Sequence, residues 1–294
     1  MTQSRADWDP GSGLGLTATE AAAARAAAAR RQDPLIIDPY AEPLVSAVGV
    51  EFFTRLAAGE LDESGFALPG MVDWVATRSR FFDDFLTASQ HAGTTQVVII
   101  GAGLDSRAYR LPWSSGATLY ELDLAEVLSF KTRTMTNLGV HPRVDHRVVG
   151  VDLRDDWVTV LRHNGFDDTV PTAWSAEGLM PYLPATARHR LLDGISALSP
   201  AGSRFAADTV VDVDKLRERI AGSPGTNVRP VEHRLDTSTA AAGSGREMVA
   251  VHLQAHRWAA TSFTAAAVFA TYGVPTPTVD VITDIEFVTA IRST

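Results

Sequence analysis

The chain carries two glycines with one residue between them, Gly101 and Gly103, directly after the apolar run Val97–Ile100. The run predicts a buried strand, and the residues after the glycines predict the start of a helix. Neither glycine has a Cβ, so a ligand could press against the backbone of Gly101, Ala102 and Gly103. Nucleotide-like cofactors bind at such turns in open α/β sheets, although these turns also serve plain strand-to-helix packing. The spacing therefore predicts a cofactor site.

The residues after the turn narrow the kind of cofactor. The dinucleotide motif G-x-G-x-x-G has a third glycine, where this chain has Ser106 preceded by Asp105. A carboxylate at this place would repel a pyrophosphate. An adenosyl compound without phosphates, carrying a sulfonium and an amino-acid tail, fits better, which predicts S-adenosyl-L-methionine. A nicotinamide cofactor, and with it an oxidoreductase, is the first alternative.

Acidic residues follow the next two predicted strands. Asp123 lies twenty residues after Gly103, the spacing at which a carboxylate reaches both hydroxyls of a ribose. Glu121 shares its strand face and is the rival, but Asp123 lies nearer the carboxyl end, where ligands bind. After the third strand, Asp152 could accept from the adenine amine while the N–H of Leu153 donates to the ring. Helix capping is the structural alternative for Asp123, and near Asp152 we expect Asp155 to be the helix N-cap.

Two further side chains lie where the reactive end of the cofactor would point. Glu177 and Tyr182 follow the fourth predicted strand. Metal chemistry is not predicted: His252 and His256 are four residues apart, but no nearby acid completes a site and the H-E-x-x-H motif is missing. We interpret both as surface or core histidines.

The elements that position these residues fall into a helical region followed by strand–helix alternation. We expect a flexible arm over 1–16, a helical lid over 17–92 and a cofactor-binding domain over 93–294, with 221–244 as a surface loop or insertion. Alternation of this kind predicts a mostly parallel sheet. The predicted strands are Val97–Ile100, Thr118–Leu122, Arg147–Val151, Thr172–Ser175, Ser203–Asp208 and a short pair near Asp280–Ile291. The predicted helices are Thr17–Arg31, Pro43–Leu56, Val72–Ser89, Leu124–Asn137, Asp155–Asn164, Ala185–Leu198 and Trp258–Tyr272.

Composition excludes several classes of protein. The 294 residues carry a formal charge of −9, which argues against a nucleic-acid partner. The chain has no cysteine, so neither disulfides nor thiolate metal sites are possible, and we expect a cytoplasmic protein. The alanine-rich segment Ala21–Ala29 is interrupted by Arg25 and is predicted to be a helix rather than a signal or membrane segment.

Together these motifs resemble the leucine carboxyl methyltransferase-like family, in its actinobacterial branch of S-adenosyl-L-methionine-dependent methyltransferases. The resemblance covers about residues 17 to 210 and is looser beyond. It implies a class I methyltransferase fold, Rossmann-like, with a mostly parallel seven-stranded sheet and a helical N-terminal lid. The matching residues are Asp38–Tyr40, Arg78–Asp83, Gly101–Arg107, Glu121–Asp123, Asp152–Leu153 and Glu177–Leu179.

The resemblance also implies roles for individual residues. In the order of the cofactor they are Arg78 at its carboxylate, Gly101 along the methionine tail, Asp123 at the ribose, Asp152 and Leu153 at the adenine, and Glu177 beside the active centre. Eukaryotic members also use a basic residue before the Asp-Pro-Tyr element, for which Arg25, Arg30 and Arg31 are the candidates here.

The predicted reaction is O-methylation of a small-molecule carboxylate or hydroxyl. A hydroxyl acceptor needs a general base, and Tyr182, His189 or Glu177 could serve. A second alternative is a module that binds S-adenosyl-L-methionine without turnover, since every cofactor contact could persist without chemistry.

Overall fold

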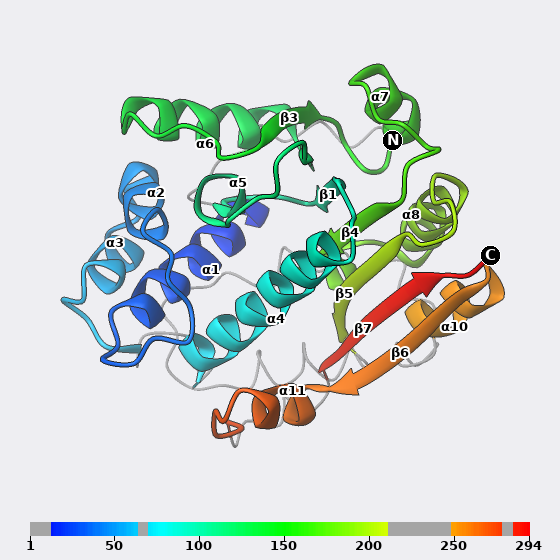
Figure 1. The fold of residues 1–294 in the computed structure, drawn as a ribbon. Coiled ribbons are helices and arrows are strands. Elements are labelled where there is room, and N and C mark those ends of the chain that lie inside the picture. The colour runs from blue at the N-terminus through cyan, green and yellow to red at the C-terminus, as the bar shows by residue number, and fades with distance from the viewer. Residues whose placement is uncertain (1–12, 64–69, 211–247, 278–284) are drawn as a thin grey trace, which may run out of the picture.

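The computed structural model describes residues 13–63, 70–210, 248–277 and 285–294. Within these residues, one seven-stranded sheet runs in the order β3-β2-β1-β4-β5-β7-β6. Strands β1 to β5 are parallel to one another, whereas β7 is antiparallel to β5 and β6 (Figure 1). The strands are β1 Gln96–Ile100, β2 Thr118–Asp123, β3 Asp145–Gly150, β4 Thr172–Ala176, β5 Arg204–Val210, β6 Trp258–Thr264 and β7 Ile285–Arg292.

The central strands owe their place to continuous apolar runs. All five residues of β1 and of β4 are buried, as expected for parallel strands covered on both faces, whereas the edge strand β3 has several exposed residues. The predicted α/β fold with a mostly parallel sheet is confirmed. The first five predicted strands are present, with ends that differ by at most two residues.

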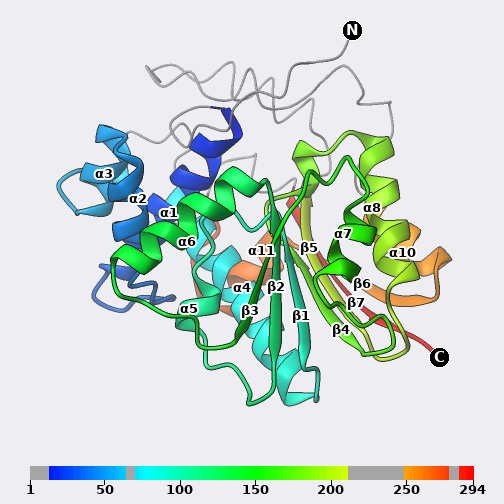
Figure 2. The ribbon, with the colours of Figure 1, turned by 90° about the horizontal axis from the view of Figure 1, so that it is seen from above.

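Helices cover both faces of the sheet, as Figure 2 shows from above. On one face α1 to α6 and α11 share a buried apolar cluster with Val97 and Ile99 of β1. On the other face α7, α8 and α10 pack against Val98 and Ile100. The helices are α1 Gly13–Ala29, α2 Ala41–Val48, α3 Glu51–Ala57, α4 Met71–His91, α5 Arg107–Arg110, α6 Ala125–Asn137, α7 Trp157–His163, the 3-10 helix η2 Met180–Tyr182, α8 Ala185–Ala197, α10 Met248–Ala255 and α11 Ala265–Thr271.

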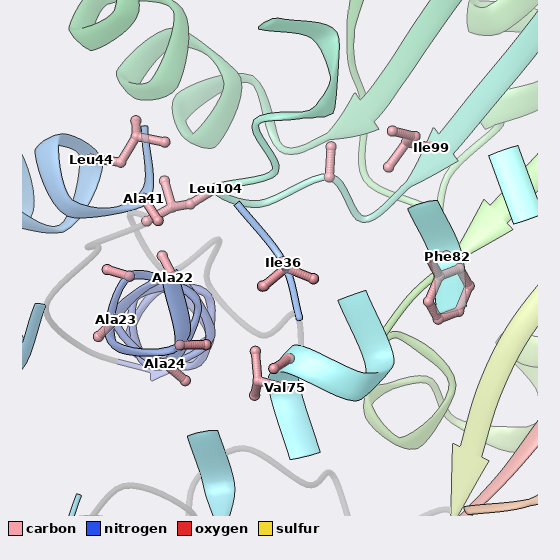
Figure 3. Packing of buried hydrophobic residues seen from close by; sticks show 14 of the residues in the cluster. Ala22, Ala23, Ala24, Ile36, Ala41, Leu44, Val75, Phe82, Ile99 and Leu104 are labelled. Atoms are coloured by element: carbon pink, nitrogen blue, oxygen red, sulfur yellow. The ribbon is translucent and has the colours of Figure 1, made fainter. Parts of the chain in front are cut away.

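The alanine-rich helix α1 lies at the centre of the N-terminal helices. Ala22, Ala23 and Ala24 are fully buried, and Figure 3 shows them between Leu44 of α2 and Val75 of α4. Because alanine has the highest helix propensity and the smallest side chain of the helix formers, it allows neighbouring helices to approach closely on several sides.

Two predicted boundaries in this region are wrong. The single helix expected over Pro43–Leu56 is two helices, because the chain takes a left-handed turn at Gly49 (φ 80°), which caps α2. Helix α1 begins at Gly13, before the predicted start at Thr17.

The C-terminal prediction is wrong in a different way. The segment Trp258–Tyr272, expected to be one helix, is strand β6 followed by α11, whose N-terminus is capped by the Thr264 hydroxyl (3.2 Å from the N–H of Ala267). Pairing with β7 overrides the local helix preference of the alanines, because a paired edge strand satisfies its backbone within the sheet. Near Asp280–Ile291 the described residues form one strand, β7, where two were expected.

The loop or insertion predicted over 221–244 falls outside the described residues. Of the flexible arm predicted over 1–16, residues 1–12 fall outside them too, whereas residues 13–16 belong to helix α1, so the arm was predicted too long. Among the described helices, none has the length and apolar character needed to cross a bilayer. The cytoplasmic location stays a prediction.

Candidate functional site

The glycine turn after β1 has the conformation that the sequence predicted. Gly101 and Gly103 have φ values of 69° and 45°, a region that side chains with a Cβ rarely adopt. The N–H groups of Gly101 and Ala102 both donate to the carbonyl of Leu122, at 2.8 and 3.1 Å, which folds the turn over the end of β2. A Cβ at Gly101 would lie 3.1 Å from Cδ1 of Leu179. The turn therefore leaves little room for a side chain at Gly101, because Leu179 packs against it at the carboxyl edge of the sheet.

Asp123 lies directly beside this turn. One carboxylate oxygen accepts from the N–H of Gly103 and the other from the N–H of Leu124, each at 2.7 Å. Burial raises the pKa of Asp123 and outweighs these two hydrogen bonds, which favour the charged form. Each carboxylate oxygen has a second lone pair, so the group can still accept from two hydroxyls.

Its rival Glu121 lies in a different environment. It is fully buried, with one carboxylate oxygen 2.9 Å from Nζ of Lys131 and 2.8 Å from Nε2 of His146. Lys131 is fully buried as well, so the two charges compensate each other inside the protein. Glu121 anchors α6 and β3 to β2.

Asp152 and Leu153 follow β3, as predicted, at the same edge. Asp152 accepts from the N–H of Arg154 at 2.9 Å and pairs with its guanidinium at 2.6 Å. The N-cap of α7 is Asp156, which accepts from the N–H of Thr159 at 3.1 Å, so the capping role expected of Asp155 is wrong by one residue. The adenine contacts of Asp152 and Leu153 stay a prediction.

Arg78 extends from α4 to the ends of β4 and β5. Its Nε donates to Glu177 at 3.0 Å, and its Nη1 lies 3.8 Å from Asp208. Asp208 in turn accepts from the N–H of Gly178 at 2.6 Å. The predicted residues Arg78 and Glu177 are thus brought together as an ion pair at the mouth of the sheet.

The sequence reasoning gave no role to Arg107, Arg110 or Asp83, which complete this ion-pair network. Arg107 is only 2% exposed, and its Nη1 lies 2.8 Å from the second oxygen of Glu177. Its Nε donates to Asp83 at 2.6 Å, and Arg110 also pairs with Asp83 at 2.6 Å. The Arg-Ser-Arg-Phe-Phe-Asp and Asp-Ser-Arg runs contain Asp83 and Arg107, but no local pattern tells which acid pairs with which arginine.

The network fixes the charge of Glu177. Burial alone would raise the pKa of Glu177, but the charges of Arg107 and Arg78 lower it below its ordinary value. For Asp208 the balance is opposite, because burial raises its pKa more than Arg78 lowers it. Glu177 is therefore an ionised carboxylate that is held between two guanidinium groups.

The N-terminal helices are attached directly to the glycine turn. Arg25 of α1 donates to Asp38 at 2.9 Å and to the carbonyl of Leu104 at 2.7 Å. Ala18 of α1 approaches Gly103, where a Cβ would lie 3.2 Å from the methyl carbon of the alanine. Of the three basic residues left open by the sequence, Arg25 pairs with the Asp-Pro-Tyr element; the others pair with exposed acids, Arg30 with Glu42 and Arg31 with Asp73.

Comparison with known families decides between a methyltransferase and the alternatives, an oxidoreductase or a binding module without turnover. A family model described as "Leucine carboxyl methyltransferase" matches residues 18–196, which include every predicted site residue. The chain belongs to the leucine carboxyl methyltransferase family. It is an S-adenosyl-L-methionine-dependent methyltransferase, as predicted, and S-adenosyl-L-methionine is its cofactor.

Two relatives of this family member carry the name "Putative S-adenosyl-L-methionine-dependent methyltransferase". One, from Mycolicibacterium vanbaalenii, is 54% identical over 273 residues, covering 92% of this chain and 92% of the relative. Another, from Mycolicibacterium gilvum, is 47% identical over 279 residues, covering 92% and 90%. Their mycobacterial sources agree with the predicted actinobacterial branch.

A solved structure shares the fold of this family member. The crystal structure of a "putative methyltransferase" from Thermobifida fusca YX matches with a TM-score of 0.52 at 14% identity, covering 92% of this chain and 94% of the other. The class I methyltransferase fold predicted from the sequence is confirmed.

One remaining prediction on the histidines is wrong. Asp193 of α8, an acid remote in sequence, lies 2.8 Å from Nε2 of His252 and 3.4 Å from Nε2 of His256. The statement that no acid lies near this pair holds along the sequence but not in space.

Proposed function

We propose that this methyltransferase methylates an oxygen of a small molecule, and that this oxygen belongs to a carboxylate rather than to a hydroxyl. The carrying observation is the state of Glu177, which is ion-paired on both oxygens and has a lowered pKa. A carboxylate that is held in this way is a poor general base, and a carboxylate acceptor needs none.

The two other candidates for a general base are His189 and Tyr182. His189 is exposed on α8, where its ring stacks on His252 at 5.3 Å between centroids. Tyr182 lies in η2 beside the site, and the variant Tyr182→Phe tests whether it acts as a base. The family description, which names a carboxyl group as the methyl acceptor, also supports a carboxylate.

The residues at the carboxyl edge of the sheet suit the cofactor. We assign the amino-acid carboxylate to Arg78, the methionine tail to Gly101, Ala102 and Gly103, and the ribose to Asp123. These assignments are supported by the left-handed backbone of Gly101 and Gly103 at the carboxyl edge of the sheet and by the free lone pairs of Asp123. When bound, S-adenosyl-L-methionine supplies a methyl group on a positively charged sulfur, so that an O–C bond forms while the S–C bond breaks.

The remaining assignments concern the two ends of the site. We assign adenine to Asp152 and Leu153, while Glu177 holds Arg78 and Arg107 in place beside the reacting atoms. Ala18 of α1 packs against Gly103 and covers part of this edge, and exclusion of water favours a displacement at a sulfonium.

A screen with a radiolabelled methyl donor and matched pairs of acceptors, each a carboxylic acid and its corresponding alcohol, tests the proposal. We expect label in the acids, released as methanol by alkali because the products are esters. Label in alkali-stable ethers, lost in Tyr182→Phe, would show a hydroxyl acceptor with Tyr182 as base. Label in neither member of any acid and alcohol pair would overturn the proposal.

A further inference from the structure

Four titratable side chains gather where α8 and α10 pack against each other; the two helices lie side by side in Figure 2. His189 and Asp193 are four residues apart on α8 and share one helix face. His252 lies on α10, and His256 directly follows the end of that helix. The rings of His252 and His256 stack at 4.7 Å, and those of His189 and His252 at 5.3 Å. The methyltransferase reaction uses none of them in the proposal above.

This histidine–aspartate cluster lies away from the cofactor edge. His256 comes two residues before β6, whose first residue, Trp258, pairs with Arg292. The adjacent Ile291 pairs with Arg204, the first residue of β5. The cluster is therefore at the edge of the sheet where β5 and β6 begin. The glycine turn, Asp123 and Glu177 lie at the opposite edge, where β1, β2 and β4 end.

The hydrogen bonds of His256 fix which of its nitrogens faces Asp193. Its Nδ1 lies 2.9 Å from the carbonyl of His252, and because a carbonyl only accepts, Nδ1 donates. In the neutral ring the proton is then on Nδ1, and Nε2 presents a lone pair to the carboxylate oxygen of Asp193 at 3.4 Å. Two acceptors at this distance repel each other, and either a second proton on the ring or a metal ion between them removes the repulsion. A backbone carbonyl on the other ring nitrogen is also how metal-binding histidines are oriented.

We propose that Asp193, His252 and His256 bind a zinc ion that links α8 to α10. Two imidazole nitrogens and one carboxylate oxygen are a donor set that suits zinc, with a fourth position open to water. The three ligand atoms lie within 4.8 Å of one another. Ligands about 2 Å from a tetrahedral ion are about 3.3 Å apart. The observed separations from Asp193, 2.8 and 3.4 Å, are close to this value. The two imidazole rings, stacked at 19° to each other, would rotate until both Nε2 atoms face the ion.

Apolar packing and a hydrogen bond already hold α8 and α10 in place without the ion. Val249 and Leu253 of α10 are buried in the apolar cluster that α8 also joins. The indole N–H of Trp258 donates to the hydroxyl of Ser196, one turn from Asp193, at 3.0 Å. The ion would add a link between surfaces that already touch, so we expect it to stabilise the fold and to leave cofactor binding unchanged.

The test uses the full chain without a polyhistidine tag, stripped with a chelator. Calorimetric titration with zinc should give one saturable site, and cobalt should give the visible absorption of a four-coordinate ion. With zinc at one hundred times its dissociation constant we expect the melting temperature to rise by about 4 °C. His256→Gln and Asp193→Asn should each lower the zinc affinity at least about tenfold, the loss typical of a removed ligand.

His163→Gln, which changes an exposed histidine on α7, is the matched control and should keep the affinity of the unaltered chain. The shift in melting temperature on adding S-adenosylhomocysteine shows that each variant is folded. The proposal is overturned if zinc gives no saturable site, or if His256→Gln and Asp193→Asn bind it as tightly as His163→Gln. In those cases the cluster is an ion pair between Asp193 and protonated histidines.

Discussion

The carboxylate of Asp123 accepts a hydrogen bond from the backbone N–H of Gly103 at 2.7 Å, across twenty residues of sequence. This bond joins the two features that predicted a cofactor site, the glycine turn after β1 and the acid at the end of β2. The residue that we assign to the ribose thus also holds the turn in place. Loss of Asp123 should therefore affect both the shape of the site and its contacts.

Asp123→Ala should abolish cofactor binding while leaving the fold intact. The variant loses two hydrogen bonds to backbone N–H groups at the edge of the sheet, which costs about 1–3 kcal/mol of stability. The measurement is the rise in melting temperature on adding S-adenosylhomocysteine, which should disappear. Glu126→Ala, at an exposed acid on α6, is the control and should keep the full rise. Normal binding by Asp123→Ala would move the ribose assignment elsewhere.

Glu121→Ala, unlike Asp123→Ala, should act mainly on the stability of the fold, which it should lower strongly. It leaves the fully buried ammonium of Lys131 without its partner, and breaking a buried pair on one side costs about 3–5 kcal/mol. Urea unfolding measures the loss. Adding Lys131→Met should restore much of it, because the unpaired charge is then gone. A stability within about 1 kcal/mol of the unaltered chain would refute the structural role of Glu121.

Local patterns predicted the parts of the fold whose determinants are local. The strand at Val97–Ile100 is a continuous apolar run, and the turn after it needs glycine for its backbone angles. The segment Trp258–Thr264 could not be predicted in this way, since it becomes a strand by pairing with Ile285–Arg292, more than twenty residues further on. The alanines just after it favour a helix, and the helix prediction extended back over the strand.

The same distinction holds for the site. Asp123, the glycines and Glu177 follow strands directly, so their common edge follows from the topology of a parallel sheet. The ion pairs around Arg107 could not be predicted, because its partners Asp83 and Glu177 are brought together only by the packing of α4 on the sheet. Asp193 was missed near the histidines for the same reason.

The ion-pair network should also make the protein sensitive to acid. Burial alone would raise the pKa of Asp105, but the nearby charges, Arg107 first among them, lower it to about 2 from an ordinary 3.8. A lowered pKa in the folded state means stability that is present above pH 3.8 and is lost as the pH falls toward 2. The shift is equivalent to about 2 kcal/mol. Asp123 has the opposite sign, because its pKa is raised, and it titrates above this window.

Urea unfolding of the unaltered chain and of Asp105→Asn at about pH 5 and about pH 2 measures this contribution. The variant should be less stable at the higher pH, and the difference between the two proteins should shrink by about 2 kcal/mol at the lower one. A difference that stays constant between the two pH values would show that the titration of Asp105 is not linked to folding.

Gly101→Ala should separate backbone strain from loss of the cofactor cradle. Gly101 and Gly116 both have positive φ, 69° and 80°, so alanine at either should cost about 1 kcal/mol or more. At Gly101 the new methyl group also meets Leu179 at 3.1 Å, within the turn that we assign to the methionine tail, whereas at Gly116 it meets nothing within 4 Å. Both variants should melt at lower temperature, but only Gly101→Ala should lose the rise on adding S-adenosylhomocysteine. Equal cofactor responses in the two variants would mean that the ligand does not approach the chain at Gly101.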